Sequence, residues 1–274
     1  MRGLVAAAVL AWVPAIVSAQ ASDAQPSQPG IEDNSFLIEE AYNQDPGIIQ
    51  EIQEFIWNWR TGSWTYSFTN EWPVCGIKNQ LSYTLQVARV QREDGTKTSG
   101  FGDLALNYRY QLIGDGEADV AMAPRLSLLV PSGSFRRELG TGSVGLQTLI
   151  PISVRLGSHF VTHGNVGLTW IPRAKDPEGD KADLLVPLVG GSMIWLTRPT
   201  FNLLCELLWQ RIETVTGQGN HDSASVFTVN PGGRYAWNFE SGLQIVAGAS
   251  TPIFFRNGRA SPSLLLYLSF EHPW

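Results

Sequence analysis

The stretch "GFGDLALNYRYQL", residues 100–112, shows the pattern on which the fold prediction depends. From Asp103 onward its polar and apolar residues alternate, as they do when successive side chains of a β-strand point to opposite faces. A soluble sheet would place this strand between a protein core and water, and an outer-membrane barrel would place it between lipid and a wet lumen. One strand cannot decide between these two settings, so the pattern of the whole chain has to be considered.

The same alternation recurs along most of the chain and predicts further strands. The segments around 184–196 and 223–236 are less regular and are assigned as strands because of their neighbours. The last stretch ends in Trp274, and its aromatic end resembles the signal read by the barrel-assembly machinery. We therefore predict an all-β fold, a transmembrane antiparallel β-barrel of about twelve strands. The clearest further strands are 64–72, 80–87, 119–130, 143–156, 163–170, 201–210 and 263–274.

The predicted connections alternate between short turns and longer polar segments. This is the layout of an outer-membrane barrel, which has tight periplasmic turns and longer extracellular loops. Nothing in a soluble β-sandwich requires short and long connections to alternate. The expected periplasmic turns are 113–118, 157–159, 197–199 and 237–238, and the expected extracellular loops are 91–100, 131–142, 172–183, 213–222 and 251–262.

The start of the chain predicts export. Residues 1–19 combine Arg2, an apolar run and small residues before a cleavage point, which is typical of a cleaved signal peptide. Residues 20–35 are polar and rich in Pro and Ser, and we expect a disordered lead-in. Residues 36–274 are then one barrel domain that begins with an N-terminal periplasmic segment. Residues 36–52 can form a strand, an amphipathic helix or a plug, and the pattern favours a strand from about Gln53 onward.

The composition fits a barrel whose outer surface faces lipid. Charged residues make up 16% of the chain, below the roughly 25% of soluble globular proteins, while 27 Gly and 10 Trp are many. The net charge of −6 and the scattered Lys and Arg argue against nucleic acid as a partner. Cys75 and Cys205 lack metal-site spacing, and we predict no metal, no cofactor and no catalytic residues. The expected partners are outer-membrane lipid, the barrel-assembly machinery and a small-molecule cargo.

Polar residues on the inward faces of the strands are the candidate functional residues. We expect Arg109, Arg125, Arg155, Asp119 and Glu206 to form the constriction of the lumen. Basic and acidic groups are nearly balanced, so selectivity should depend on width and hydrogen bonding more than on net charge. The same side chains could instead pair with one another and close the lumen. The predicted lumen-lining residues are Asp103, Asn107, Arg109, Asp119, Arg125, Gln147, Arg155, His163, Glu206, Arg234 and Glu240.

Three stretches resemble the family named for the MetA pathway of phenol degradation. They are "SFLIEEAYNQDPGIIQ" (35–50), "GFGDLALNYRYQL" (100–112) and "PRLSLLVPSGS" (124–134), the last followed by "GTGSVGLQTLIPISVRLG" (140–157). The resemblance covers most of the chain after the signal peptide. It implies an outer-membrane barrel that acts as a channel or transporter for small molecules, including hydrophobic or aromatic ones.

Two other functions stay open at this point. A closed barrel could serve structure or adhesion through its loops. A lipid hydrolase would need a serine and a histidine near the rim, with a carboxylate or amide to orient the histidine. His221 lies beside Asp222 and Ser223, but residues adjacent in sequence do not thereby form a triad.

Overall fold

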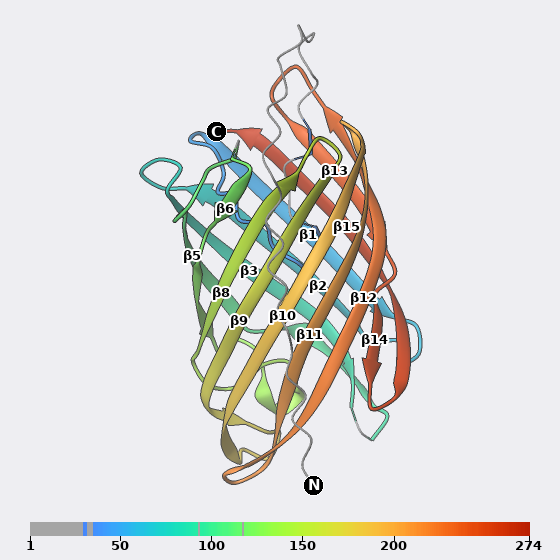
Figure 1. The fold of residues 1–274 in the computed structure, drawn as a ribbon. Coiled ribbons are helices and arrows are strands. Elements are labelled where there is room, and N and C mark those ends of the chain that lie inside the picture. Colours follow the sequence, from blue (N-terminus) through green and yellow to red (C-terminus); the bar gives the residue numbers. More distant parts are fainter. Residues whose placement is uncertain (1–29, 32–34, 93, 117) are drawn as a thin grey trace, which may run out of the picture.

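A computed structural model describes residues 30–31, 35–92, 94–116 and 118–274 of the chain. They form one antiparallel β-barrel that closes where the first strand pairs with the last (Figure 1). The fold class is therefore confirmed, including the number of 12 strands around the wall. The elements are β1 (Ile48–Asn58), β2 (Trp64–Pro73), β3 (Asn79–Gln91), β4 (Lys97–Phe101), β5 (Leu104–Tyr110), β6 (Val120–Met122), β7 (Arg125–Val130), η1 (Phe135–Arg137), β8 (Gly145–Leu156), β9 (Phe160–Lys175), β10 (Lys181–Arg198), β11 (Phe201–Gly217), β12 (Asn220–Asn238), β13 (Gln244–Ser250), β14 (Ile253–Arg256) and β15 (Arg259–Pro273).

Three of the wall strands are each broken into two segments. β4 and β5 both pair with β3, β6 and β7 both pair with β8, and β13 and β14 both pair with β12 and β15. Pro124 and Pro252 lie at two of the breaks, where the missing N–H interrupts the ladder. This is how 15 strand segments make a 12-stranded wall.

The barrel has two unlike rims. The terminal rim carries the start of β1 and the end of β15, where Trp274 donates its backbone N–H to the Gly47 carbonyl at 3.0 Å. It lies at the top of Figure 1, where the C-terminus is marked. The opposite rim, here called the loop rim, carries the segment between β7 and β8 with its 3-10 turn η1 (Phe135–Arg137).

The expected alternation of long and short connections is wrong in detail. At the loop rim only residues 218–219 separate β11 from β12, and only 257–258 separate β14 from β15. Most of the predicted 213–222 loop is instead strand, and so is much of 251–262. At the terminal rim the expected turn at 237–238 belongs to β12, and the turn follows at 239–243.

Long strands account for this difference. β9 to β12 have 16, 18, 17 and 19 residues, whereas crossing a bilayer takes about 9–11. We infer from this extra length that their ends at the loop rim extend past the lipid, where both faces can be polar. Polar residues therefore continue the strands there, although their composition is typical of loops.

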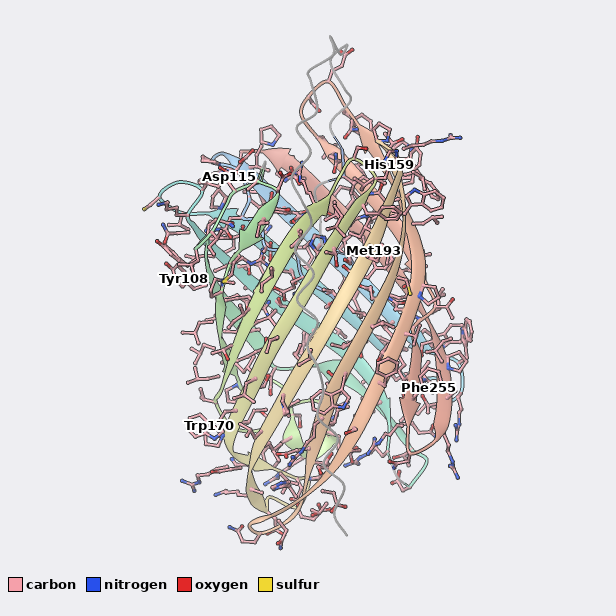
Figure 2. All side chains as sticks on the ribbon, in the orientation of Figure 1. Tyr108, Asp115, His159, Trp170, Met193 and Phe255 are labelled. Carbon is pink, nitrogen blue, oxygen red and sulfur yellow. The ribbon has the colours of Figure 1, made fainter. Side chains whose placement is uncertain are left out.

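The side-chain alternation separates the outer and inner faces of the wall. Leu106 is 44% exposed on the outer face, whereas its neighbour Asn107 is 4% exposed inside. Figure 2 shows the same arrangement for Tyr108, Trp170 and Phe255, whose side chains lie on the outside of the ribbon. The described residues include no helix long and apolar enough to cross a membrane.

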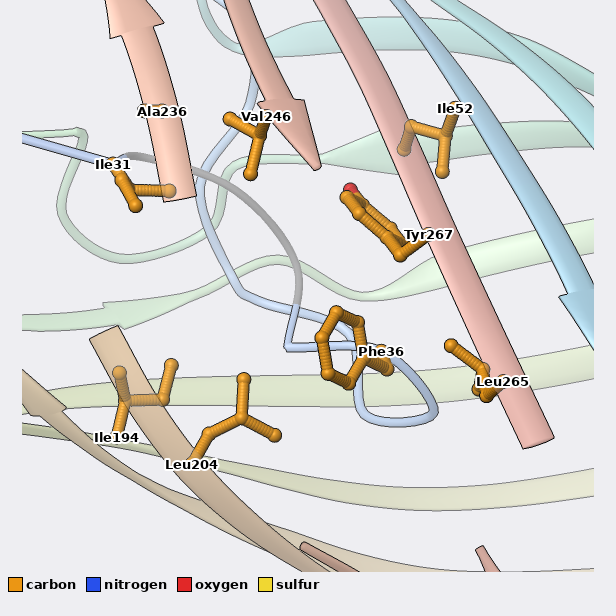
Figure 3. Packing of buried hydrophobic residues seen from close by; sticks show 9 residues of the cluster. All are labelled: Ile31, Phe36, Ile52, Ile194, Leu204, Ala236, Val246, Leu265 and Tyr267. Carbon is orange, nitrogen blue, oxygen red and sulfur yellow. The ribbon is translucent and has the colours of Figure 1, made fainter. Parts of the chain in front are cut away.

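The main apolar cluster lies inside the barrel. Phe36 packs there between the side chains of β15 and those of β10 and β11, as Figure 3 shows for Tyr267, Ile194 and Leu204. Ile31 also belongs to this cluster. The segment that the sequence predicted to be periplasmic therefore lies in the lumen, and Ile31 and Ser35 are buried although we expected a disordered lead-in. The predicted signal peptide and most of that lead-in lie outside the described residues.

Candidate functional site

The lumen holds a segment without helix or strand, residues 35–46, here called the plug segment. Its deepest part lies at Glu206 on β11. One carboxylate oxygen of Glu206 accepts the backbone N–H groups of Phe36, Leu37 and Ile38 at 2.9, 2.9 and 3.0 Å. The other oxygen accepts the Asn230 side-chain amide at 2.6 Å. Three successive N–H groups around one anion form a concave anion site, and here the anion is a side chain of the barrel wall.

Further hydrogen bonds join the plug segment to wall residues on the way across the lumen from β9 to β3. The backbone N–H of Glu39 donates to Asn165 at 2.8 Å, and that of Ala41 donates to Ser153 at 2.7 Å. Closer to the terminal rim, Asn43 donates to Gln111 at 2.9 Å, and Gln44 donates to Gln80 at 2.7 Å. The wall thus supplies side-chain acceptors to a backbone that has no sheet or helix partner of its own.

Two ion pairs of Glu39 hold the middle of the plug segment to the wall. The Glu39 carboxylate contacts Arg109 at 3.0 Å and Arg125 at 2.6 Å, from β5 and β7. Arg109 is only 3% exposed and also donates to the Tyr42 carbonyl at 3.2 Å. A buried guanidinium needs such partners because its desolvation is costly. Glu39 therefore offsets one of the two positive charges that these arginines bring into the lumen.

Three wall glycines let the plug segment approach the backbone of the strands. A Cβ at Gly248 would lie 2.6 Å from the ring of Phe36, and one at Gly232 would lie 2.8 Å from it. A Cβ at Gly190 would lie 2.5 Å from the Ile38 side chain. These distances are shorter than real Cβ contacts, so a side chain at any of the three positions would force the plug segment to shift.

Tyr42 faces the part of the lumen on the side of the terminal rim. Its ring packs against Ala121 and Ala123 in a small buried cluster, and the Arg155 guanidinium lies 5.9 Å from the ring centre. Burial raises the pKa of the Tyr42 phenol above its usual 10, so this group stays neutral at physiological pH. A neutral ring on this side gives the lumen an apolar surface.

Among the residues that the structure describes, the plug segment separates two cavities in the lumen. The loop-side cavity has a volume of about 530 Å³, and its lining includes Leu37, Glu54, Asp103, Asn107 and Gln147. It shares Gly140 and Thr141 with a mouth of about 780 Å³ at the loop rim. The terminal-side cavity has a volume of about 490 Å³, and its lining includes Tyr42, Val161, His163, Asn202 and Arg234. The loop-side and terminal-side cavities share none of the described lining residues.

Most of the predicted lumen residues lie in one of three places, which are the plug segment contacts, the terminal-side cavity and the loop-side cavity. Arg109, Arg125 and Glu206, three of the five expected at the constriction, all contact the plug segment. Arg155, His163 and Arg234 line the terminal-side cavity. Asp103, Asn107, Arg125 and Gln147 line the loop-side cavity, where Asp103 accepts the backbone N–H groups of Gly133 and Thr141 at 2.9 and 2.8 Å.

Two predicted lumen residues lie away from these cavities. Asp119 is exposed just before β6, and Glu240 is exposed in the turn after β12. Glu240 follows the last residue of β12, Asn238, so the alternation of the strand no longer applies to it. Sequence reasoning also missed Gln80, Ser153 and Ser192 as site residues, although all three contact the plug segment. The alternation of the strands indicates that these three side chains point inward, but it does not indicate which residues they contact.

The histidine considered for a hydrolase has another neighbour. His221 lies 3.6 Å from the Glu213 carboxylate, while Asp222, the next residue of β12, points to the opposite face of the strand. In the part of the chain that the structure describes, no group of three His, Cys, Asp or Glu residues could hold a metal ion. Cys75 and Cys205 are both free.

Comparison with known structures and families agrees with the barrel. The COG4313 outer membrane channel from Pseudomonas putida F1 is similar, with a TM-score of 0.65, 13% identity and coverage of 85% of this chain and 98% of that one. The translocator domain of the autotransporter NalP from Neisseria meningitidis gives a TM-score of 0.41, 10% identity and coverage of 83% and 87%. At these identities the likeness concerns the fold alone. No curated protein matches the sequence significantly. The family model described as "Putative MetA-pathway of phenol degradation" matches residues 47–253, which is most of the chain, and the chain belongs to that family.

Proposed function

We propose that this protein is an outer-membrane channel for small molecules and that the plug segment must shift for them to pass. The observation that carries the proposal is the divided lumen, with cavities of about 530 and 490 Å³ on either side of residues 35–46. Both cavities are within the usual size of small-molecule sites. In this proposal the terminal rim faces the periplasm and the loop rim faces the exterior.

The way the plug segment is held supports movement. It pairs with no strand and is fixed by contacts with individual wall side chains, which include the ion pairs of Glu39 and the packing of Phe36. The net contribution of each hydrogen bond is about 0.5–1.5 kcal/mol between neutral groups and about 1.5–3 kcal/mol where one group is charged. A segment of this kind can leave its seat in parts, whereas a wall strand cannot leave without opening the barrel. The wall can therefore stay intact while the lumen opens.

We propose small hydrophobic or aromatic molecules as the cargo class. The family description refers to phenol degradation, and apolar side chains such as Ile194 and Leu196 line the terminal-side cavity. Selectivity would then depend on width and on the polar groups along the lumen. The second candidate is a closed structural barrel, which the extensive contacts of the plug segment favour.

A reversible lock on the plug segment separates these two candidates. The Ser35 and Ser192 hydroxyls are 2.7 Å apart, so a cysteine pair at these positions should form a disulfide between plug and wall. The variant Ser35→Cys/Ser192→Cys is made in a background with Cys75→Ser and Cys205→Ser. Single-channel conductance in planar bilayers and solute uptake by liposomes are then measured before and after reduction.

For a channel with a mobile plug segment, we expect oxidation to abolish conductance and solute uptake, and reduction to restore both. The single variant Ser35→Cys in the same background is the control, and redox conditions should not affect it. If neither the locked nor the reduced protein conducts or takes up solute, the barrel is closed and the proposed function is wrong. If the locked protein conducts as well as the reduced one, the plug segment need not move.

A further inference from the structure

We propose that the terminal-side cavity is a binding site for small aromatic carboxylates. The inference deepens the proposed function and rests on it for the identity of the cargo. Binding itself can be measured without any transport. Three features of the cavity support the inference, namely its apolar walls, an unpaired buried amide and its excess of basic groups.

The walls of the cavity fit a flat apolar body. Val161, Ile194 and Leu196 project from β9 and β10, and Tyr42 covers the cavity from the plug segment. The volume of about 490 Å³ is larger than one aromatic ring needs, so a ring with a short substituent can enter. The lining also includes Ser158 and His159, which belong to the turn between β8 and β9 at the terminal rim. This places the cavity next to that rim.

One buried amide in the lining lacks a partner. Asn202 on β11 is 1% exposed, and neither its side-chain nitrogen nor its side-chain oxygen has a hydrogen-bond partner. Arg234 lies directly opposite Asn202 in the register of β11 and β12. His163 on β9 also lines the cavity. Buried amides are normally hydrogen-bonded, so this exception needs an explanation. With a turn of the Asn202 side chain toward the cavity, a carboxylate there would accept the amide N–H and lie near the Arg234 guanidinium, which also lines the cavity.

The charge of the lumen changes sign across the plug segment. The terminal-side cavity is lined by Arg155, Arg198 and Arg234 against the single acid Glu40. The loop-side cavity has the reverse excess, with one arginine, Arg125, against four acids. These four acids are Glu39, Glu54, Glu71 and Asp103.

An anion is therefore favoured in the terminal-side cavity and disfavoured in the loop-side cavity. Guanidinium groups match the planar geometry of a carboxylate. The apolar walls favour an organic anion over an inorganic one, because an inorganic ion would leave them without contacts. An aromatic carboxylate meets both requirements.

Isothermal titration of the whole protein in detergent micelles, with benzoate as the probe and micelles alone as the blank, tests this inference. Benzamide has nearly the same shape without the charge, and acetate has the charge without the ring. We expect saturable benzoate binding and affinities at least about tenfold weaker for both analogues. Absence of saturable benzoate binding to the folded protein, or equal affinity for benzamide, would overturn the inference.

Two variants locate the site. Asn202→Leu removes the unpaired amide at similar volume, and Asn202→Asp places a negative charge there opposite Arg234. We expect benzoate affinity to fall about tenfold for the first variant and further for the second. Asn220→Leu, the same exchange as the first variant at the exposed first residue of β12, should bind like the unaltered protein.

Heat-dependent migration on gels verifies that each variant is folded. Unchanged benzoate affinity in both folded Asn202 variants would place binding elsewhere and contradict the inference. Benzoate binding without any solute uptake in liposomes would leave the site intact and refute the channel. Uptake without benzoate binding would do the opposite.

Discussion

The Glu206 carboxylate on β11 accepts the backbone N–H of Phe36 at 2.9 Å, although 170 residues separate them in the chain. The same carboxylate oxygen also accepts Leu37 and Ile38, so one wall residue fixes the deepest turn of the plug segment. Glu206 is completely buried, and a buried carboxylate requires partners of this kind. The wall and the plug segment thus depend on each other at this point.

Replacing Glu206 should therefore release the plug segment. Glu206→Leu leaves the three N–H groups without an acceptor, and we expect the docked state to lose about 1–3 kcal/mol. Single-channel recordings should show higher conductance or more frequent opening.

Glu206→Gln is the milder control for this experiment. Its amide oxygen can still accept the three N–H groups, and Asn230 can turn its unpartnered side-chain oxygen toward the new amide N–H. Equal conductance for Glu206→Leu, Glu206→Gln and the unaltered protein would mean that this anchor does not hold the lumen closed.

A larger residue at Gly248 should displace Phe36 from its seat. A Cβ at this position meets the Phe36 ring at 2.6 Å, and Gly248→Val adds two more carbon atoms there. We expect increased solute uptake in liposomes and faster proteolysis of the plug segment. Gly164→Val is the matched control, because nothing lies within 4 Å of a Cβ at Gly164. Uptake that rises equally in both variants would indicate a general loosening of the wall.

Removing the charge of Glu39 should change ion selectivity. Glu39→Gln leaves Arg109 and Arg125 without the carboxylate that both contact, so the lumen gains one positive charge. We expect the reversal potential in a salt gradient to shift toward anion permeation, and more strongly at low ionic strength because screening is weaker. Asp94→Asn changes an exposed acid at the mouth and should shift the potential less. An unchanged reversal potential for Glu39→Gln would place the conducting path away from this cluster.

Arginine scanning of β5 tests which face meets the lipid. Leu106→Arg places a charge on the outer face and should cost about 2–4 kcal/mol at the bilayer midplane. Ala105→Arg, one residue earlier, points into the loop-side cavity with its excess of acids and should cost much less. The free energy of unfolding in lipid vesicles, from reversible denaturant titration, gives the comparison. A larger loss for Ala105→Arg would reverse the assignment of the two faces.

The barrel could be predicted from the sequence because its rule is local. A strand with lipid on one side and a polar lumen on the other must alternate its residues, as the adjacent pair Leu106 and Asn107 does. Strand ends were predicted less well. Residues 213–217 and 220–222 extend β11 and β12 beyond the length that a bilayer crossing needs, and outside the lipid nothing requires one face to be apolar. The inward direction of Arg109, Arg125 and Glu206 follows from the same alternation.

Tertiary structure alone decided what these inward residues contact. The sequence of residues 35–46 has no strand or helix period, so no local pattern could place Phe36 against Gly248 or Glu39 beside Arg109. Those contacts exist only after the wall has closed, because closure brings β5, β7, β9 and β11 around one space. The sequence by itself thus determined a barrel with a polar interior, because the outer face of each strand needs apolar residues toward lipid and the inner face carries polar ones. The division of that interior into two cavities of opposite charge depends on contacts between residues far apart in the chain.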